Sequence, residues 1–115
     1  MPERRKLAAL KTRGDPARLR LLVKGRVQGV GFRPTIYRIA RNSRVGGFVR
    51  NTRLGVVIEI EGPPSAIEAF LRGFETALPP LARIDALEAA EVELRGIREF
   101  VIMPSEEAGA AETIF

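Results

Sequence analysis

The chain has 115 residues, of which 45% are hydrophobic and 29% charged, a composition that suits one domain with its own core. It contains neither cysteine nor histidine, which excludes a disulfide scaffold, a zinc ribbon, a thiol nucleophile and histidine-based catalysis. The formal net charge is +5, but residues 1–16 hold five basic and two acidic residues, so +3 of that excess lies at the N-terminus.

The N-terminal segment, residues 1–17, is predicted to be a basic, flexible tail. We expect it to solubilise the chain; a nonspecific polyanion contact and an extension of the start site are the alternatives. The segment lacks the apolar stretch of a secretory signal, and no apolar run elsewhere is long enough to cross a bilayer. We therefore expect a cytoplasmic protein with no membrane partner.

A first strand is predicted from about Arg18 to Lys24, and a glycine-rich loop, GRVQGVGFR, follows from Gly25 to Arg33. Pro34 marks the start of a helix to about Asn42, because proline is favoured at the first helical position. Anions bind at such junctions, where free backbone N–H groups converge and the helix dipole favours negative charge. The loop is neither a Walker A loop nor a G-x-G-x-x-G fingerprint.

The next elements follow from changes in periodicity. In the helix, Ile36, Ile39 and Ala40 share one apolar face, and Gly46-Gly47 then ends the helical period. A strand begins at Phe48 and turns through residues 52–54 into a second strand, residues 56–61. That strand alternates apolar residues with Glu59 and Glu61, which predicts a half-buried antiparallel strand.

The second half predicts one more helix and two strands. Ser65 and Glu68 have the spacing of a capping box at the helix start. A helical apolar stripe follows and Pro79-Pro80 ends it; the stripe consists of Ile67, Phe70, Leu71, Phe74 and Leu78. Residues 84–94 and 100–103 predict a strand and a short closing strand, and residues 105–115 predict an acidic tail or linker.

The order β-α-β-β-α-β with an extra terminal strand predicts an α+β fold, a ferredoxin-like split βαβ sandwich over residues 18–104. Both helices then cover one face of an antiparallel sheet. The stripe of the second helix is therefore expected to pack in the core rather than to hold a cofactor.

Two segments carry a resemblance to a known family. VQGVGFR, residues 27–33, resembles the first signature of the acylphosphatase family, and GGFVRN, residues 46–51, resembles its second at about the family's separation. The similarity extends from about Arg18 to Pro104. GVGFRP followed by TIYRIA is most similar to the acylphosphatase domain at the N-terminus of the carbamoyltransferase that matures NiFe hydrogenases. Phe48 stands where many members have Trp, an exchange expected to preserve packing.

The resemblance implies hydrolysis of the carboxyl-phosphate bond of acyl phosphates, with no metal and no cofactor. Asn51 would position the attacking water, and Arg33 would hold the phosphoryl oxygens. The phosphate would also be bound by backbone N–H groups of the loop, those of Gln28, Gly29, Val30, Gly31, Phe32 and Arg33. Taken singly, the glycines suit a tight turn, Arg33 a surface charge and Asn51 a turn residue; the two motifs together favour a site.

The substrate implied by the resemblance is carbamoyl phosphate, and the implied partners are further domains of a longer carbamoyltransferase and other hydrogenase-maturation proteins. One alternative is a stand-alone acylphosphatase that acts on other small acyl phosphates. Others are a phosphate-binding module without turnover and an RNA-binding ferredoxin-like module. RNA binding needs aromatic residues on the sheet, and with one Tyr and no Trp we expect no specific nucleic acid.

The remaining polar and aromatic residues near the motifs are expected to have simpler roles. Phe32 and Tyr37 are interpreted first as packing residues. The cations Arg26, Arg50 and Arg53 are expected to be exposed, where they can widen the electrostatic funnel for an anion.

Overall fold

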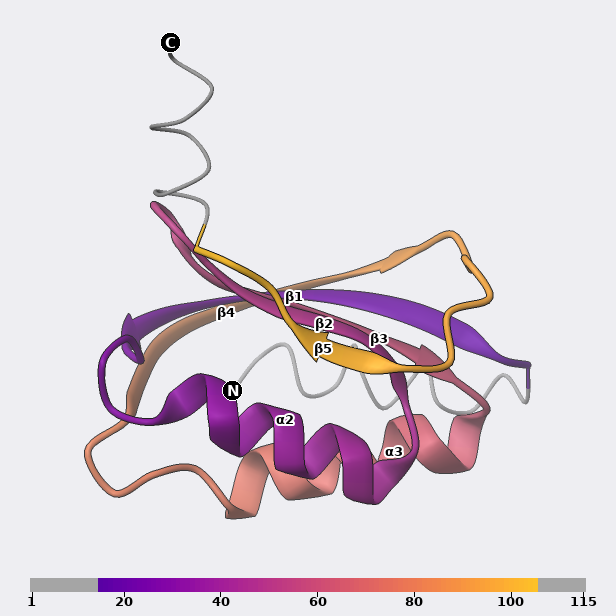
Figure 1. Cartoon of the computed structure of the whole chain (residues 1–115), viewed down its shortest axis with the longest axis horizontal. Helices are drawn as coiled ribbons and strands as arrows, with labels where there is room; N and C mark the ends of the chain where they lie inside the picture. The colour runs from indigo at the N-terminus through magenta and orange to yellow at the C-terminus, as the bar shows by residue number, and fades with distance from the viewer. Residues whose placement is uncertain (1–14, 106–115) are drawn as a thin grey trace, which may run out of the picture.

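A five-stranded sheet with two helices on one face makes up the part of the chain that the computed structural model describes, residues 15–105 (Figure 1). The predicted tails therefore lie outside the described residues, apart from residues 15–17 and Ser105. Ala17, which the sequence assigned to the tail, is the first residue of a strand. No helix in the described range has the length and hydropathy needed to cross a membrane.

The predicted order of elements is confirmed. The elements are β1 (Ala17–Arg26), α2 (Phe32–Ser43), β2 (Gly46–Thr52), β3 (Gly55–Gly62), α3 (Pro64–Thr76), β4 (Arg83–Val92) and β5 (Phe100–Ile102). The strand order is β4-β1-β3-β2-β5, and β1 to β4 pair antiparallel. The short closing strand β5 pairs with β2 in parallel, so the complete sheet is mixed. This is the ferredoxin-like α+β sandwich with one added edge strand.

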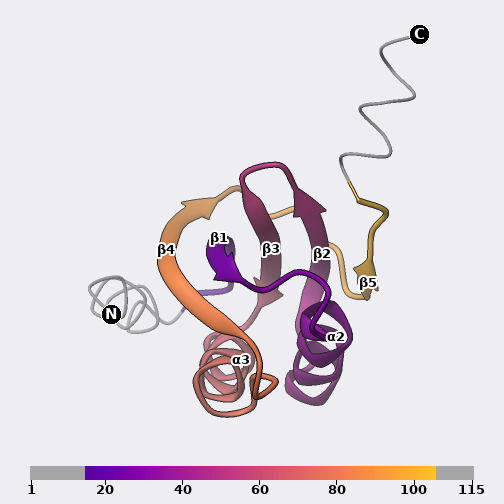
Figure 2. The same cartoon turned by 90° about the vertical axis from the view of Figure 1, so that its left-hand side faces the viewer.

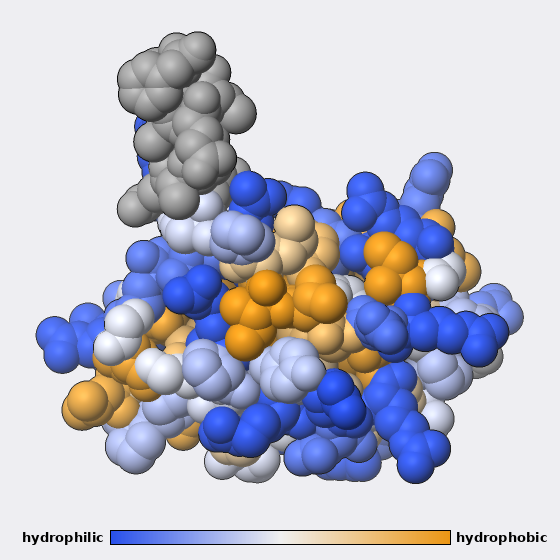
Figure 3. Space-filling view, viewed as in Figure 1, coloured by the Kyte–Doolittle hydropathy of each residue, from blue (hydrophilic) through white to orange (hydrophobic). Residues whose placement is uncertain are grey.

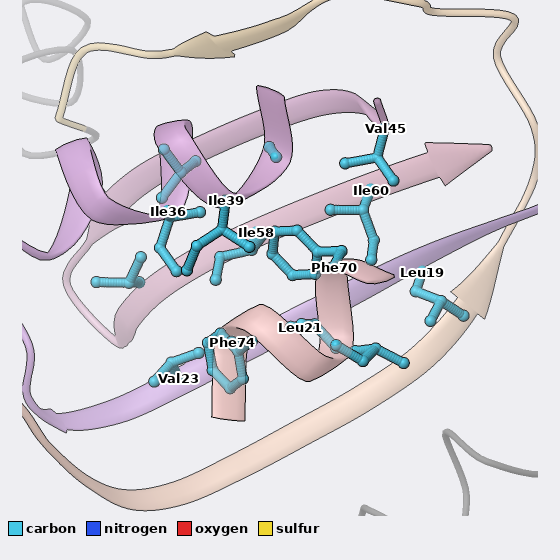
Figure 4. Close-up of a cluster of buried hydrophobic side chains, with 14 of the residues drawn as sticks. Leu19, Leu21, Val23, Ile36, Ile39, Val45, Ile58, Ile60, Phe70 and Phe74 are labelled. Carbon is cyan, nitrogen blue, oxygen red and sulfur yellow. The ribbon is translucent and has the colours of Figure 1, made fainter. Parts of the chain in front are cut away.

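The core lies between the sheet and the helices, as the alternation of apolar residues predicts (Figure 4). Alternate residues of the strands pack there against the apolar stripes of the helices. Five of these core residues are fully buried: Leu21, Ile36, Ile58, Ile60 and Phe70. Of the α3 stripe, Leu78 alone is partly exposed, since it follows the end of the helix. Phe70 and Phe74 stack with ring centroids 6.2 Å apart. The stripe is core, as expected.

The open face of the sheet differs from the half-buried strand that is predicted for residues 56–61. Glu59 and Glu61 on β3 are only 7% and 8% exposed, and Arg18 on β1 is completely buried between them. The Arg18 guanidinium donates to Glu59 Oε1 and to Glu61 Oε1, each at 2.7 Å. Arg20 adds a bond to Glu59 Oε2 at 2.9 Å. Each buried charge therefore has a partner of opposite charge.

The segment between β4 and β5, residues 93–99, is fixed to this face by Glu61. The backbone N–H groups of Arg95 and Gly96 donate to the Glu61 carboxylate at 2.9 and 2.7 Å. Burial alone raises the pKa of Glu61, but these two N–H groups and the Arg18 guanidinium outweigh it, so the pKa lies below the ordinary value. The ionised carboxylate thus holds the chain segment that carries β5 to the far edge of the sheet.

Both helices begin differently from the prediction. Helix α2 starts at Phe32, two residues before Pro34, because the first-turn N–H groups of a helix need no intrahelical acceptor and proline is tolerated there. The predicted capping box at α3 is wrong. The helix starts at Pro64 after the N-cap residue Pro63, without a side-chain cap. Glu68 pairs instead with Arg72 at 2.9 Å.

Candidate active site

The glycine loop connects β1 to α2 at one end of the sheet, where Figure 2 looks onto it beside the β2–β3 hairpin. Val27 is buried and Val30 packs against the core, so these two valines anchor the loop. Gly29 and Gly31 have φ angles of 73° and 80°, in the left-handed region that favours glycine. No atom lies within 4 Å of where a Cβ would stand on either residue. The loop therefore leaves open space beside its backbone.

The start of α2 supplies unpaired backbone donors to the same place. Gly31 is the N-cap residue and provides no side-chain cap, and the first turn has no acidic residue. The first intrahelical bond runs from Thr35 N–H to the Gly31 carbonyl, so the N–H groups of Phe32 and Arg33 have no acceptor within the helix. Two free donors at the positive end of a helix dipole suit an anion such as a phosphate.

Arg33 stands in this first turn and is half-buried. Within residues 15–105, its guanidinium makes neither an ion pair nor a hydrogen bond. A planar cation without a partner is available to bind two oxygens of one phosphoryl group. Phe32 is only 1% exposed, which confirms its packing role and leaves its backbone N–H as the group that a ligand can reach.

Asn51 lies near the end of β2, on the face of the sheet that the helices cover, because it is two residues after the buried core residue Val49. Its Oδ1 is buried and has no hydrogen-bond partner among the described residues. An unpartnered buried acceptor is uncommon, since burial without a hydrogen bond is costly. The described part of the fold therefore leaves the side-chain oxygen of Asn51 free to accept a hydrogen bond from a ligand.

A side-chain hydrogen bond brings the loop and the end of β2 together. Gln28 Nε2 donates to the carbonyl of Thr52 at 3.2 Å. Thr52 is 7% exposed and stabilises the hairpin, since its Oγ1 donates to the Gly55 carbonyl at 2.8 Å and accepts the Leu54 N–H at 3.2 Å. The structure therefore places the predicted phosphate loop and Asn51 at one end of the molecule.

Sequence reasoning missed two contributions to this arrangement. The first motif predicts a role only for the backbone N–H of Gln28, whereas its side chain bridges to the hairpin. Thr52 lies in the segment predicted only as a turn, and the bond from the Leu54 N–H to its hydroxyl is a hydroxyl turn motif that the sequence could have indicated.

The surrounding cations also differ from expectation in one case. Arg26 and Arg53 are exposed as predicted, but Arg50 is half-buried and its Nε lacks a partner in the described range. The same range contains no group of three or more His, Cys, Asp or Glu residues that could hold a metal ion.

Comparison with known proteins places the chain in a family. The sequence model for acylphosphatase matches residues 19–102. The chain belongs to the acylphosphatase family. The chain is 50% identical over 88 residues to a carbamoyltransferase HypF from Rhizobium leguminosarum bv. viciae, a match that covers 76% of the chain and 11% of the relative. It is 42% identical over 87 residues to an acylphosphatase from Thermococcus kodakarensis, which covers 75% of the chain and 94% of the relative.

A solved structure agrees with both matches. Full-length HypF in the phosphate- and nucleotide-bound form has a TM-score of 0.75 to this chain at 37% identity, over 79% of the chain and 12% of that protein. The chain thus spans about one tenth of the length of the HypF relatives and nearly the whole length of a separate acylphosphatase.

Proposed function

We propose that this chain hydrolyses acyl phosphates at the junction of the glycine loop, the start of α2 and the end of β2. The observation that carries the proposal is the pair of unused groups: the Arg33 guanidinium and the buried Asn51 Oδ1 both lack partners among the described residues. The Gln28–Thr52 bond holds together the two elements that bear them. A cation and a hydrogen-bond acceptor that both lack partners and lie at the same end of the fold indicate a ligand site.

In the proposed reaction, Arg33 and the loop N–H groups hold the phosphoryl oxygens, and Asn51 accepts a hydrogen bond from the attacking water. The water oxygen bonds to phosphorus as the bond from phosphorus to the carboxyl oxygen breaks. A water proton passes to a phosphoryl oxygen, so the products are a carboxylate and dihydrogen phosphate. The carboxylate is a good leaving group, so positioning and charge stabilisation suffice and no nucleophile from the chain is needed.

We propose carbamoyl phosphate as the substrate, with carbamate as the carboxylate product. The support is the 50% identity to a carbamoyltransferase HypF, of which the chain corresponds to one short portion. In that setting, further domains of a longer protein are the partners that use the carbamate. A second candidate is a separate acylphosphatase with other small acyl phosphates, which the match over 94% of the Thermococcus kodakarensis protein supports.

The test is hydrolysis of carbamoyl phosphate, acetyl phosphate and benzoyl phosphate in the presence of EDTA. Asn51→Ala is expected to lower kcat by roughly 100- to 1000-fold with a small change in KM, since one preorganised group acts mainly in the transition state. Arg33→Ala should lower kcat and raise KM together. Asn42→Ala and Arg72→Ala, on exposed positions of α2 and α3, are the matched controls and should keep the parental rate.

The outcomes separate the candidates. Parental turnover by either site variant would remove the role assigned to that residue. A kcat/KM for carbamoyl phosphate at least tenfold above those for the other two substrates would favour the carbamoyltransferase setting, and equal values would favour the separate enzyme. Phosphate binding without turnover of any substrate would leave a binding module.

A further inference from the structure

Strand β5 leaves one edge of the sheet without a neighbouring strand in the described part of the chain. On its inner side, the Gly47 N–H donates to the Glu99 carbonyl and the Met103 N–H donates to the Val49 carbonyl, both at 2.9 Å. Backbone groups of successive strand residues point to alternate sides, so Phe100 and Ile102 direct their N–H and C=O groups outward. An edge with unpaired groups is a template for another strand.

A groove of about 640 Å³ runs beside this edge, between β5 and the C-terminal part of α2. Val101 and Ile102 are 46% and 42% exposed. Tyr37 on α2 forms part of the lining, and its ring centroid is 6.4 Å from that of Phe100. Figure 3 shows an apolar patch in the region of β5, surrounded by hydrophilic residues. Exposed apolar side chains next to unpaired backbone groups are the surface that an extended peptide needs.

The charges along the groove are mostly positive. Arg41, Arg44 and Arg98 line it, against a single carboxylate, Glu99. Arg41 is held by Tyr37, since its Nη1 donates to the Tyr37 hydroxyl at 2.9 Å and the guanidinium lies 5.7 Å from the ring centroid. The guanidinium groups of Arg44 and Arg98 have no hydrogen bond or ion pair within residues 15–105. Two unpaired cations beside an apolar groove favour a ligand that carries carboxylates.

This charge decides between possible occupants. Two copies of the chain joined edge to edge through β5 would bring the arginines of both copies together, and like charges at an interface oppose association. An acidic segment of another protein has the complementary charge. We propose that the β5 edge binds an extended, acidic segment of a partner protein as an additional strand. Its backbone pairs with Phe100 and Ile102. Because successive strand side chains point to opposite faces, the apolar side chains of the segment cover Val101 on the open face, and its carboxylates reach Arg44 and Arg98 on the face that α2 covers.

The proposed docking site is separate from the hydrolytic site. Arg33 stands at the first turn of α2 and Arg44 directly after its last residue, about 16 Å apart along a helix. The two sites can therefore be tested independently, and loss of one leaves the other measurable.

The experiment uses the full chain, labelled with ¹⁵N, and a seven-residue peptide that alternates glutamate with valine. Amide chemical shifts are recorded as the peptide is added at low salt. We expect shifts confined to β5, residues 97–99 and the C-terminal turn of α2. A peptide with lysine in place of glutamate tests the charge, and one with a central proline tests strand pairing, because proline removes a backbone donor.

Two variants test the residues. The double variant Arg44→Glu, Arg98→Glu should weaken binding of the acidic peptide by about tenfold or more, and Arg95→Glu, whose side chain lies outside the groove, should leave it unchanged. Retained hydrolysis of benzoyl phosphate shows that the double variant is folded.

Four results would overturn the proposal. They are no amide shift at millimolar peptide, shifts located at the glycine loop, equal binding of the lysine peptide, and equal binding by the double variant. Shifts of the β5 amides that grow with protein concentration alone would show that a second copy occupies the groove. Shifts of the same amides on substituting Glu106 and Glu107 by Gln, without peptide, would show that residues 106–115 of this chain occupy it.

Discussion

Replacement of Arg18 by Met should destabilise the fold severely, because Arg18 pairs with two buried carboxylates. It makes two charge-assisted bonds of 2.7 Å, to Glu59 and Glu61, each of which contributes about 1.5–3 kcal/mol. Removing one partner of a buried ion pair costs about 3–5 kcal/mol. We expect a loss of that size in the free energy of unfolding measured with urea, a large part of the roughly 5–15 kcal/mol typical of a domain.

Arg20→Met is the matched control for this measurement. Arg20 binds the same carboxylate, Glu59 Oε2, at 2.9 Å, but its side chain is 51% exposed. Solvent screens such a pair, so its removal should cost at most about 1 kcal/mol. Similar small losses for Arg18→Met and Arg20→Met would refute the idea that the buried cluster stabilises the open face of the sheet.

The pH dependence provides a second check on the same cluster. The pKa of Glu61 in the folded parent is below the ordinary value of 4.5, so the stability from this group is present above that value and is lost as the pH falls through the folded pKa. In Arg18→Met, burial remains and part of the compensation is gone. The difference in stability between parent and variant should therefore be largest near neutral pH and should narrow in acid. A difference that stays constant from about pH 7 to about pH 3 would contradict this reasoning.

Three further predictions concern the hydrolytic site. Gln28→Ala should cost only about 0.5–1.5 kcal/mol of stability in urea unfolding yet lower kcat, because it removes the bond that aligns the loop with Asn51; an unchanged kcat would show that the bond is incidental. Gly25→Ala should destabilise the fold, since its Cβ would overlap the Arg83 carbonyl, whereas Gly29→Ala should fold with a loss of about 1 kcal/mol and raise KM, as its Cβ enters open space beside the loop. Thermal melts should therefore show the larger loss of stability for Gly25→Ala, and kinetics should show the raised KM for Gly29→Ala. Equal effects of both substitutions would contradict the roles assigned to these two glycines. The kcat should be independent of pH between about pH 6 and pH 9, since the proposed reaction passes the water proton to the substrate's own phosphoryl oxygen and uses no acid or base of the chain; a bell-shaped profile would indicate a catalytic acid or base in the chain.

The sequence predicted the fold well because local patterns and the fold agree. Period-two alternation in residues 56–61 and the stripe of α3 specify which side chains meet in the core, and the structure confirms both. The open face was predicted less well. Glu59 and Glu61 alternate with apolar residues as solvent-facing positions do, and nothing local shows that Arg18 and residues 95–96 cover them. Such burial depends on contacts between residues more than thirty positions apart.

For the proposed hydrolytic site, two motifs predicted the loop, Arg33 and Asn51 as its residues, but not how they are aligned. The bond from Gln28 to the Thr52 carbonyl joins a side chain to a backbone group 24 residues away, and backbone acceptors leave no mark in a sequence. The lack of a hydrogen-bond partner for Asn51 Oδ1 among the described residues is likewise a property of the packed structure. The motifs could predict which residues gather, and only the structure shows which of their groups remain free to bind.

The direction of α2 gives a reason to assign different roles to the arginines at its two ends. A cation in the last turn, such as Arg41, interacts favourably with the negative end of the helix dipole and needs no ligand there. Arg33 occupies the opposite end, where the dipole is positive and the first turn has no acidic residue, so its placement opposes the dipole by about 0.3–1 kcal/mol. A phosphoryl dianion bound between Arg33 and the free N–H groups is attracted both to the guanidinium and to the positive end of the dipole, and so offsets this repulsion. An arginine held at an unfavourable position without a partner is therefore better explained by a bound anion than by stability, which is the physical reason to assign the chemistry to this end of the helix.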